Sequence, residues 1–185
     1  MAAAFAVAMP SAVVASGRGT AGGDAKSHRV FVYGTLKRGF YNHRLLEDCE
    51  ARFVAEAKTH ASMRLVLGDF GVPYVMDEHA TTGTQIPGEL WEVNDSGLEA
   101  LDVLEGVDVG MYQRVDVQVV VQMDKSNEFA DGAESAWGYV TGPESVKRGV
   151  GDESCEQIEQ YDLETHQRAY VPKHERPEGS LGARR

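Results

Sequence analysis

Two places in the sequence combine the residue types and the spacing that chemistry requires. The first is a run at residues 29–33, rich in β-branched and aromatic side chains, which is followed at once by Gly34. This pattern predicts a buried strand that enters a sharp turn. Successive backbone N–H groups exposed in such a turn can bind a carboxylate or an oxyanion. An ordinary tight turn without a ligand fits the same residues.

The second place is Glu105, which ends a predicted helix whose leucines are expected to face the core. A carboxyl group beside an apolar cluster loses hydration, which raises its pKa and makes it a usable base near neutral pH. The alternative is a glutamate exposed at the end of a helix. Glu99 and Asp102 on the same helix are expected to be solvated.

The sequence motifs of other common catalytic and metal sites are either absent or lack a residue type that they require. Residues 34–39 have the G-x-x-x-x-G spacing of a P-loop, but Phe40 and Tyr41 stand where Lys and Ser or Thr are needed. The sequence contains no G-x-S-x-G elbow and no H-E-x-x-H helix. Cys49 and Cys155 form no C-x-x-C pair, so we expect two reduced thiols rather than a zinc site or a disulfide. A metal site built from scattered positions stays open, although none is predicted.

The remaining pattern predicts the elements that must position these groups. Helices are expected over residues 42–53, with Asn42 as the N-cap, and from a capping box at Ser96 to Gly106. A short helix is also expected near residues 153–160. Few helices have the length of a crossover between parallel strands, so we expect an α+β fold with a largely antiparallel sheet or small barrel. Further strands are expected around residues 64–67, 74–76, 89–93, 113–122 and 136–140.

Composition excludes several classes of protein. The 185 residues include 18 Lys and Arg against 29 Asp and Glu, a net charge of −11, which argues against binding to nucleic acid or to an anionic membrane. Residues 1–28 are expected to be a disordered tail or a targeting segment, residues 29–172 the domain, and residues 173–185 an irregular tail. We expect a monomer in the cytoplasm, unless residues 1–28 direct it to an organelle.

Several motifs, taken in chain order, resemble the gamma-glutamylcyclotransferase-like superfamily. They are the YGTLKRG block at residues 33–39, Asn42 with His43, the GELWEV segment at 88–93, the LDVLEG segment at 101–106, and Tyr112 with Arg114. The extended first block and the ending at residues 161–172 are most similar to the gamma-glutamylamine cyclotransferase branch.

The resemblance implies a small mixed, largely antiparallel β-barrel with short flanking helices and a pocket at one end. It implies no metal and no organic cofactor, and it makes Glu105 the general acid and base. The backbone of the first motif is implied to hold the glutamyl group, and three side chains are further candidates for substrate binding. These residues are Tyr33, Gly34, Thr35 and Leu36 for the backbone, and Tyr112, Arg114 and Tyr170 for the side chains.

Two of these side chains keep a structural alternative. Arg114 either pairs with an acidic residue or faces a substrate carboxylate, and Tyr170 either covers the pocket or packs in the core.

The implied reaction turns a γ-glutamyl amine, such as γ-glutamyl-lysine isopeptide, into 5-oxoproline and the free amine. One alternative within the same chemistry is a cyclotransferase for γ-glutamyl amino acids or glutathione. Another is a cyclising enzyme that removes a γ-glutamyl protecting group. An alternative from a different class is a non-catalytic module that binds a small ligand or a protein on the same fold.

Overall fold

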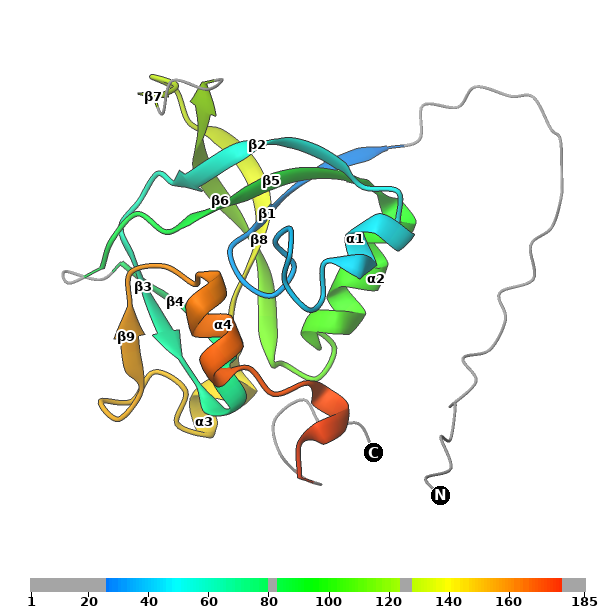
Figure 1. Cartoon of the computed structure of the whole chain (residues 1–185). Helices are drawn as coiled ribbons and strands as arrows, with labels where there is room; N and C mark the ends of the chain where they lie inside the picture. Colours follow the sequence, from blue (N-terminus) through cyan, green and yellow to red (C-terminus); the bar gives the residue numbers. More distant parts are fainter. Residues whose placement is uncertain (1–25, 80–82, 124–127, 178–185) are drawn as a thin grey trace, which may run out of the picture.

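Five strands close into a small barrel in the computed structural model, which describes residues 26–79, 83–123 and 128–177 (Figure 1). The barrel strands are β1 (Ser27–Val32), β2 (Arg52–Thr59), β5 (Pro87–Asn94), β6 (Tyr112–Met123) and β8 (Glu134–Thr141), and a sixth strand of the same sheet, β7 (Glu128–Phe129), pairs with β6. Their order is β2-β5-β1-β8-β6-β7, and a further pairing of β2 with β6 closes the barrel. Among the described pairings, β1 and β8 run parallel and the others antiparallel. The predicted mixed, largely antiparallel barrel is confirmed.

A second, antiparallel sheet lies against the barrel. It has the order β4-β3-β9, with β3 at Met63–Leu67, β4 at Pro73–His79 and β9 at Glu156–Ile158. Two hydrogen bonds made by the backbone of Val75 connect β4 to the barrel. Its N–H donates to the Tyr33 hydroxyl at 3.3 Å, and its carbonyl accepts from Thr141 Oγ1 at 2.8 Å. The start of β4 is thereby fixed beside the end of β1.

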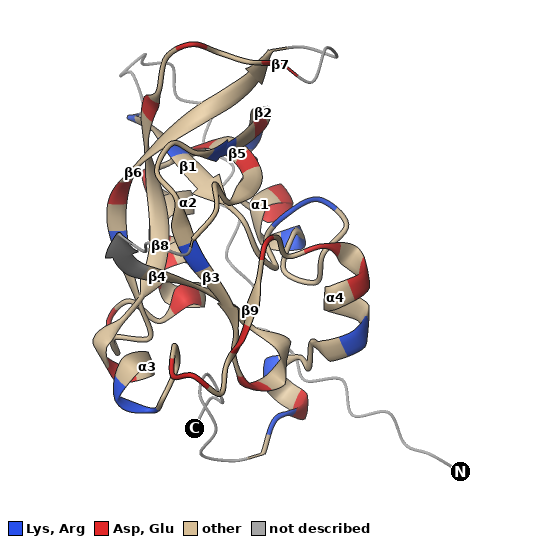
Figure 2. Ribbon diagram, turned by 90° about the vertical axis from the view of Figure 1, so that its left-hand side faces the viewer, with Lys and Arg blue, Asp and Glu red and all other residues tan. Residues whose placement is uncertain are grey.

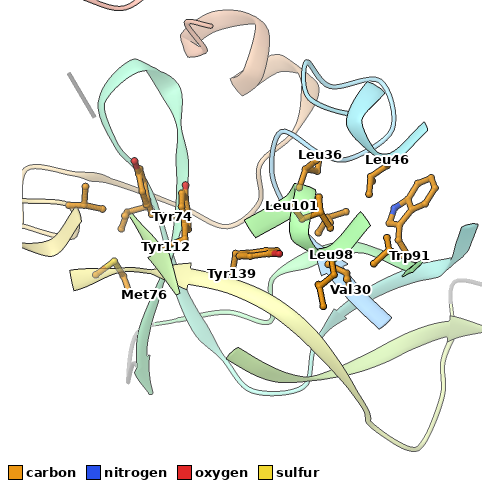
Figure 3. Packing of buried hydrophobic residues seen from close by; sticks show 14 residues of the cluster. Val30, Leu36, Leu46, Tyr74, Met76, Trp91, Leu98, Leu101, Tyr112 and Tyr139 are labelled. Carbon is orange, nitrogen blue, oxygen red and sulfur yellow. The ribbon is translucent and has the colours of Figure 1, made fainter. Parts of the chain in front are cut away.

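Strand β1 is apolar on both faces because it separates two parts of the core. Val30 and Val32 pack in one cluster with Leu98 and Leu101, whereas Phe31 belongs to a second cluster. Figure 3 shows Leu98 and Leu101 beside Val30, with the chain of the barrel running around them. A strand buried on both faces reads as a continuous apolar run rather than as an alternation.

Helix α2 (Asp95–Glu105) carries the glutamate that the sequence singles out. Its N-cap is Asn94, whose Oδ1 accepts from the N–H of Gly97 at 2.8 Å. The predicted cap at Ser96 was therefore wrong. Ser96 lies inside the first turn and donates its hydroxyl to Asn94. Gly106 ends the helix as predicted, in the left-handed conformation at φ 65° that glycine adopts without strain.

The helix predicted over residues 42–53 is much shorter. Helix α1 spans only Arg44–Asp48, with His43 rather than Asn42 at the N-cap position. Glu50 has φ 53°, and this left-handed residue turns the chain out of the helix and into β2. Phe53, which has helical spacing in the sequence, packs instead from β2 against Trp91, with ring centroids 5.4 Å apart.

The prediction for the C-terminal third was also wrong in part. Residues expected in a short helix contain strand β9, which forms because the edge of β3 supplies backbone partners. Two short helices were not predicted from the sequence, namely α3 (Pro143–Lys147) and α4 (Leu163–Ala169). Helix α4 has an N-cap at Asp162, whose Oδ1 accepts from the N–H of Thr165 at 2.8 Å.

The ends of the fold differ from the predicted boundaries. The expectation for residues 1–28 falls largely outside the described residues, but β1 begins at Ser27, before the predicted start at residue 29. At the other end, Lys173–Glu175 forms a 3₁₀ turn within the predicted tail. No helix among the described residues is long and apolar enough to cross a membrane.

The face drawn in Figure 2 shows Lys and Arg positions interspersed with Asp and Glu positions, as on α4, rather than gathered into one basic stripe.

We expect Leu101→Ala to lower the free energy of unfolding by about 2–5 kcal/mol, the usual cost of a cavity at a fully buried leucine. Leu101 is 0% exposed, one helical turn before Glu105. Urea denaturation followed by circular dichroism measures the change. Val103→Ala is the matched control on the same helix, because Val103 is 69% exposed and should change stability by less than about 0.5 kcal/mol. Equal effects at both positions would contradict the packing described here.

Candidate active site

A cavity lies where the end of β1, the start of β4, the end of α2 and the segment after α4 meet. Its empty volume is about 610 Å³, a figure that includes the open mouth. The lining residues come from positions far apart in the sequence. They are residues 31–36, Asn42, Val72, Pro73, Leu104, Glu105, Met111, Tyr112, Tyr139, Tyr170, Lys173 and Arg176.

The turn after β1 forms one wall and is fixed by close packing. A Cβ atom on Gly34 would come within 2.8 Å of Pro73 Cγ, so the glycine is required by this close approach. Thr35 is fastened to Asn42 twice, through Asn42 N to its carbonyl at 2.9 Å and Asn42 Nδ2 to its hydroxyl at 2.8 Å. Within the described chain, the backbone N–H groups of Gly34, Thr35 and Leu36 donate no hydrogen bond. Because these three residues also line the cavity, their N–H groups are candidate donors to a ligand bound there.

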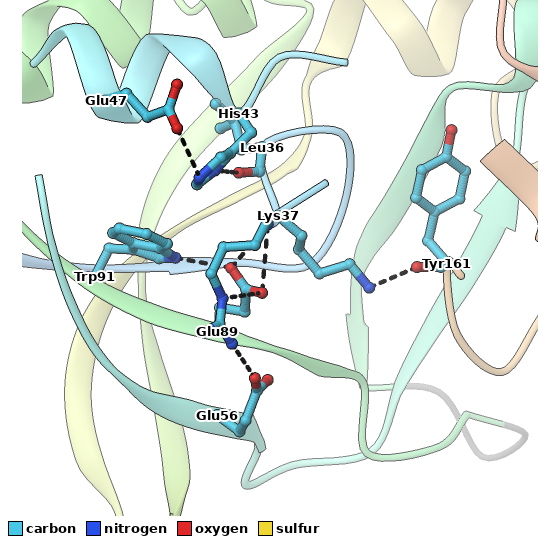
Figure 4. Close-up of polar contacts among 9 residues, drawn as sticks. Leu36, Lys37, His43, Glu47, Glu56, Glu89, Trp91 and Tyr161 are labelled. Carbon is cyan, nitrogen blue, oxygen red and sulfur yellow. Dashed lines mark hydrogen bonds and ion pairs between the residues drawn. The ribbon is translucent and has the colours of Figure 1, made fainter. Parts of the chain in front are cut away.

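A network on the far side of the turn keeps it in place (Figure 4). Glu89 is buried, and its carboxylate accepts from Arg38 Nε at 3.0 Å and from Trp91 Nε1 at 3.0 Å. Lys37 reaches in the other direction and donates to the carbonyl of Tyr161 at 2.5 Å. The two residues that follow Leu36 therefore anchor the turn to β5 and to the segment before α4.

Three of the residues that line the cavity are the buried tyrosines Tyr33, Tyr112 and Tyr139. The Tyr33 hydroxyl donates to the carbonyl of Tyr139 at 2.7 Å, and the Tyr112 hydroxyl donates to that of Pro73 at 2.9 Å. Tyr74 stacks on Tyr112 with ring centroids 4.9 Å apart (Figure 3). Burial raises the pKa of Tyr33 and of Tyr112 well above the usual range, so both stay neutral. Their hydroxyls hold backbone groups and give the cavity rigid walls.

Glu105 is the one carboxylic acid among the described residues that line this cavity. It is half-buried, and burial raises the pKa of its carboxyl to about 7, although the positive charge of Lys173 acts in the opposite direction. None of the hydrogen bonds or ion pairs among the described residues involves this carboxyl. Glu105 can therefore take up and release a proton near neutral pH.

The cavity brings together most of the predicted site residues. Glu105, Tyr112, Tyr170 and the turn residues 33–36 all line it. Tyr170 is half-buried at the wall, where Asn42 Nδ2 reaches its hydroxyl at 3.5 Å.

Arg114 lies elsewhere, in the arrangement of its structural alternative. Its Nη1 donates to Asp102 Oδ2 at 2.6 Å, and its guanidinium lies 5.1 Å from the centroid of the Trp137 ring. Asp102 also accepts from the Tyr139 hydroxyl at 2.8 Å. The expectation that Asp102 is solvated was wrong, because β6 and β8 supply two donors to it, whereas Glu99 is exposed as expected.

Sequence reasoning missed the two cations of the cavity. Lys173 and Arg176 lie in the predicted tail, yet both line the wall beside Glu105 and Tyr170. Arg176 is only 8% exposed, and its Nε donates to the carbonyl of Val171 at 2.8 Å. The signal that could have identified them is their position shortly after Tyr170, as two basic residues in a chain whose net charge is −11.

The described residues contain no group of three or more His, Cys, Asp or Glu side chains that could hold a metal ion. Cys49 and Cys155 form no disulfide.

We expect Glu105→Gln to stabilise the protein increasingly as the pH rises from about 5 to 8. A carboxyl whose pKa rises from 4.5 to about 7 on folding stabilises the native state fully only below the lower value. That contribution is lost as the pH rises through about 7, and its full size is up to about 3 kcal/mol. Unfolding in urea at several pH values measures the difference between variant and wild type. Glu99→Gln, at an exposed carboxylate of the same helix, is the control. A difference that does not change with pH would show that Glu105 is solvated.

Comparison with known proteins of similar sequence and structure identifies the family of the chain. The family model described as gamma-glutamyl cyclotransferase, AIG2-like, matches residues 30–173. Gamma-glutamylaminecyclotransferase of Rattus norvegicus is 38% identical over 96 residues, which cover 50% of this chain and 63% of the rat protein. The protein of the same name from Homo sapiens is 37% identical over 109 residues, covering 57% and 67%.

A crystal structure of an AIG2-like protein from Mus musculus superposes with a TM-score of 0.63 at 28% identity. This match covers 83% of the present chain and 98% of the mouse chain. In sequence, the chain spans about half to two thirds of the length of the curated relatives it matches. Because the family model covers most of the chain, the protein belongs to the gamma-glutamyl cyclotransferase, AIG2-like family.

Proposed function

We propose that the protein is a cyclotransferase that converts a γ-glutamyl amine into 5-oxoproline and the free amine, with γ-glutamyl-lysine isopeptide as a representative substrate. One observation carries the proposal most directly. In a member of this family, a glutamate whose carboxyl pKa is raised by burial to about 7 lines the same cavity as the turn at residues 34–36.

The reaction needs no external nucleophile. The α-amine of a γ-glutamyl donor attacks its own γ-carbonyl carbon, and the new C–N bond closes a five-membered lactam. The amide C–N bond then breaks and the amine leaves. An intramolecular attack of this kind has an effective concentration of roughly 10⁵ M or more when it is well oriented. A cavity with rigid walls contributes by holding the donor in the folded conformation that attack requires.

Two proton transfers remain, and we assign both to Glu105. It takes a proton from the attacking nitrogen and delivers one to the leaving nitrogen, so the protein ends in its starting state. An α-ammonium group has a pKa near 8, about 3.5 units above that of an ordinary glutamate. Raising the pKa of Glu105 to about 7 removes most of that mismatch, which is worth about 3 kcal/mol.

The turn at residues 34–36 supplies the anion-binding part of the proposal. Its backbone N–H groups suit either the α-carboxylate of the glutamyl group or the oxyanion that forms on the γ-carbonyl. For an oxyanion, each donor contributes about 3 kcal/mol to stabilisation of the transition state.

We expect Glu105→Gln to lower kcat by roughly 10²–10⁴-fold, the usual contribution of a general acid and base. The assay measures 5-oxoproline released from γ-glutamyl-lysine isopeptide, γ-glutamyl-alanine and glutathione, with Glu99→Gln as the control. Near wild-type turnover in the Glu105 variant would overturn the mechanism. A folded wild-type protein that releases 5-oxoproline from none of the donors would instead favour a binding module.

We expect Gly34→Ala to lower kcat/KM by about tenfold or more, because its methyl group must displace either Pro73 or the turn. Displacements of about 1 Å near reacting atoms can cost roughly 10²-fold in rate. Steady-state kinetics with the best donor of the panel measure the effect. Gly132→Ala is the matched control, since a Cβ there would meet nothing within 4 Å. Unchanged kinetics in Gly34→Ala would exclude the turn from the site.

A further inference from the structure

Asp102 lies on the same helix as Glu105, three residues earlier, and its side chain binds two strands of the barrel. Side chains three positions apart are neighbours on one face of a helix, so whatever fixes Asp102 also restrains the turn that carries Glu105. Asp102 Oδ2 accepts from Arg114 Nη1 on β6 at 2.6 Å, and Asp102 Oδ1 accepts from the Tyr139 hydroxyl on β8 at 2.8 Å. Both carboxylate oxygens thus fasten α2 to the barrel.

Arg114 and Tyr139 reach the helix together because they face each other across the sheet. They are directly opposed in the antiparallel pairing of β6 with β8, which places their side chains on the same face. In Figure 3 the Tyr139 hydroxyl points toward the helix that carries Leu98 and Leu101. The guanidinium of Arg114 lies 5.1 Å from the ring centroid of Trp137. The sheet therefore presents two neighbouring donors to one carboxylate.

The backbone of Asp102 closes the helix on the other side of Glu105. Its carbonyl accepts from the N–H of Val107 at 3.1 Å, around the left-handed turn at Gly106. Glu105 is therefore enclosed between an anchored side chain three residues before it and a closed helix end directly after it. Loss of the anchor frees the last turn of α2 and, with it, the Glu105 carboxyl.

Tyr139 also connects the helix to the turn after β1. Its hydroxyl donates to Asp102, while its carbonyl accepts from the Tyr33 hydroxyl at 2.7 Å, and Tyr33 directly precedes Gly34. Glu105 and the turn are the two parts of the site that the proposed cyclisation uses. One chain of hydrogen bonds thus sets the position of both relative to the barrel.

Arg114 begins this chain from outside the site, because it is not among the described residues that line the cavity. It therefore acts on the reaction either through Asp102 or through its charge. We propose that Asp102 and Arg114 are positioning residues for the cyclisation, which hold the last turn of α2 so that the Glu105 carboxyl stays in the cavity and withdrawn from water. The inference rests on the proposed function, because it gives these two residues a part in the proton transfers assigned to Glu105.

Position and charge predict opposite changes in the acid limb of the pH profile, where kcat/KM rises as Glu105 loses its proton. Loss of a nearby cation disfavours the charged form of a carboxyl, so an effect of charge in Arg114→Met would raise the pKa of Glu105 and move the limb to higher pH. Loss of position lets the carboxyl meet water, which lowers its pKa toward the ordinary value and moves the limb to lower pH.

The other charged and titratable groups around Glu105 stay unchanged in Arg114→Met, so they shift the limb in neither direction. They are the cations of the segment after α4 and the tyrosines of the surrounding strands and of the cavity wall. These residues are Lys173, Arg176, Tyr33, Tyr74, Tyr112, Tyr139 and Tyr170.

We expect Arg114→Met to lower kcat by about tenfold, with a smaller change in KM, and to move the acid limb by about one unit toward lower pH. Arg114→Lys, which keeps the charge and a donor, should restore both. Arg52→Met is the matched control. Arg52 Nη2 donates to Glu92 Oε2 at 2.6 Å between two other barrel strands, so this variant removes the same charge and an ion pair of the same length.

An acid limb that stays in place would give Arg114 a role in stability alone and overturn the inference. A limb that moves to higher pH would show an effect of charge and overturn it as well, and so would an equal shift in Arg52→Met. Should Arg114→Met not fold, Arg114→Gln breaks the ion pair with a smaller change in polarity and carries the same expectation.

A titration without turnover separates failure of this inference from failure of the proposed function. NMR of protein labelled at its glutamate carboxyl carbons follows the ionisation of Glu105, and Glu105→Gln identifies its resonance. If no donor releases 5-oxoproline from the wild type, the proposed function has failed. A pKa of Glu105 that falls in Arg114→Met would still support positioning by Asp102 and Arg114. An unchanged or raised pKa would overturn it.

Discussion

The carboxyl of Glu105 loses hydration without gaining a hydrogen bond or an ion pair from the described residues, and the rest of the site depends on this imbalance. Two other carboxylates of the protein show the usual solution. Asp102, three residues earlier on the same helix, accepts from Arg114 and Tyr139. Glu89 is buried but accepts from Arg38 and Trp91. Hydrogen bonds thus satisfy both of these carboxylates, whereas burial raises the pKa of Glu105 to about 7.

The imbalance requires a rigid frame, because a mobile carboxyl would reach water and return to its ordinary pKa. Helix α2 provides that frame. Leu101 packs in the core, Asp102 ties the helix to β6 through Arg114, and Gly106 ends it directly after the glutamate. The salt bridge of Arg114 thus acts on the site from outside the cavity, by fixing the helix that carries Glu105.

The parts of the site that a few consecutive residues encode could be predicted from the sequence. The parts that depend on contacts between distant segments of the chain could not. The turn at Gly34 and the helix end at Glu105 are each encoded within a few residues. Strand β9 exists because β3 offers an edge, and the pairing of Asp102 depends on an arginine that β6 brings back to the helix. Lys173 reaches Leu104 across 69 positions of sequence, so no local pattern could place it in the cavity.

The locally encoded parts of the site and the parts brought in from distant segments also differ in how firmly the fold holds them. The turn and Glu105 belong to the barrel and its helix, whose packing would be lost if they moved. Lys173 and Arg176 belong to a short segment near the end of the described chain, and Lys173 donates to the carbonyl of Leu104. Neither residue belongs to the two apolar clusters of the core, so the side chains at this side of the cavity can vary while the barrel stays intact. A fold built in this way can keep the turn and Glu105 in place and still change the other side chains that line the cavity, because the two are encoded in different parts of the chain.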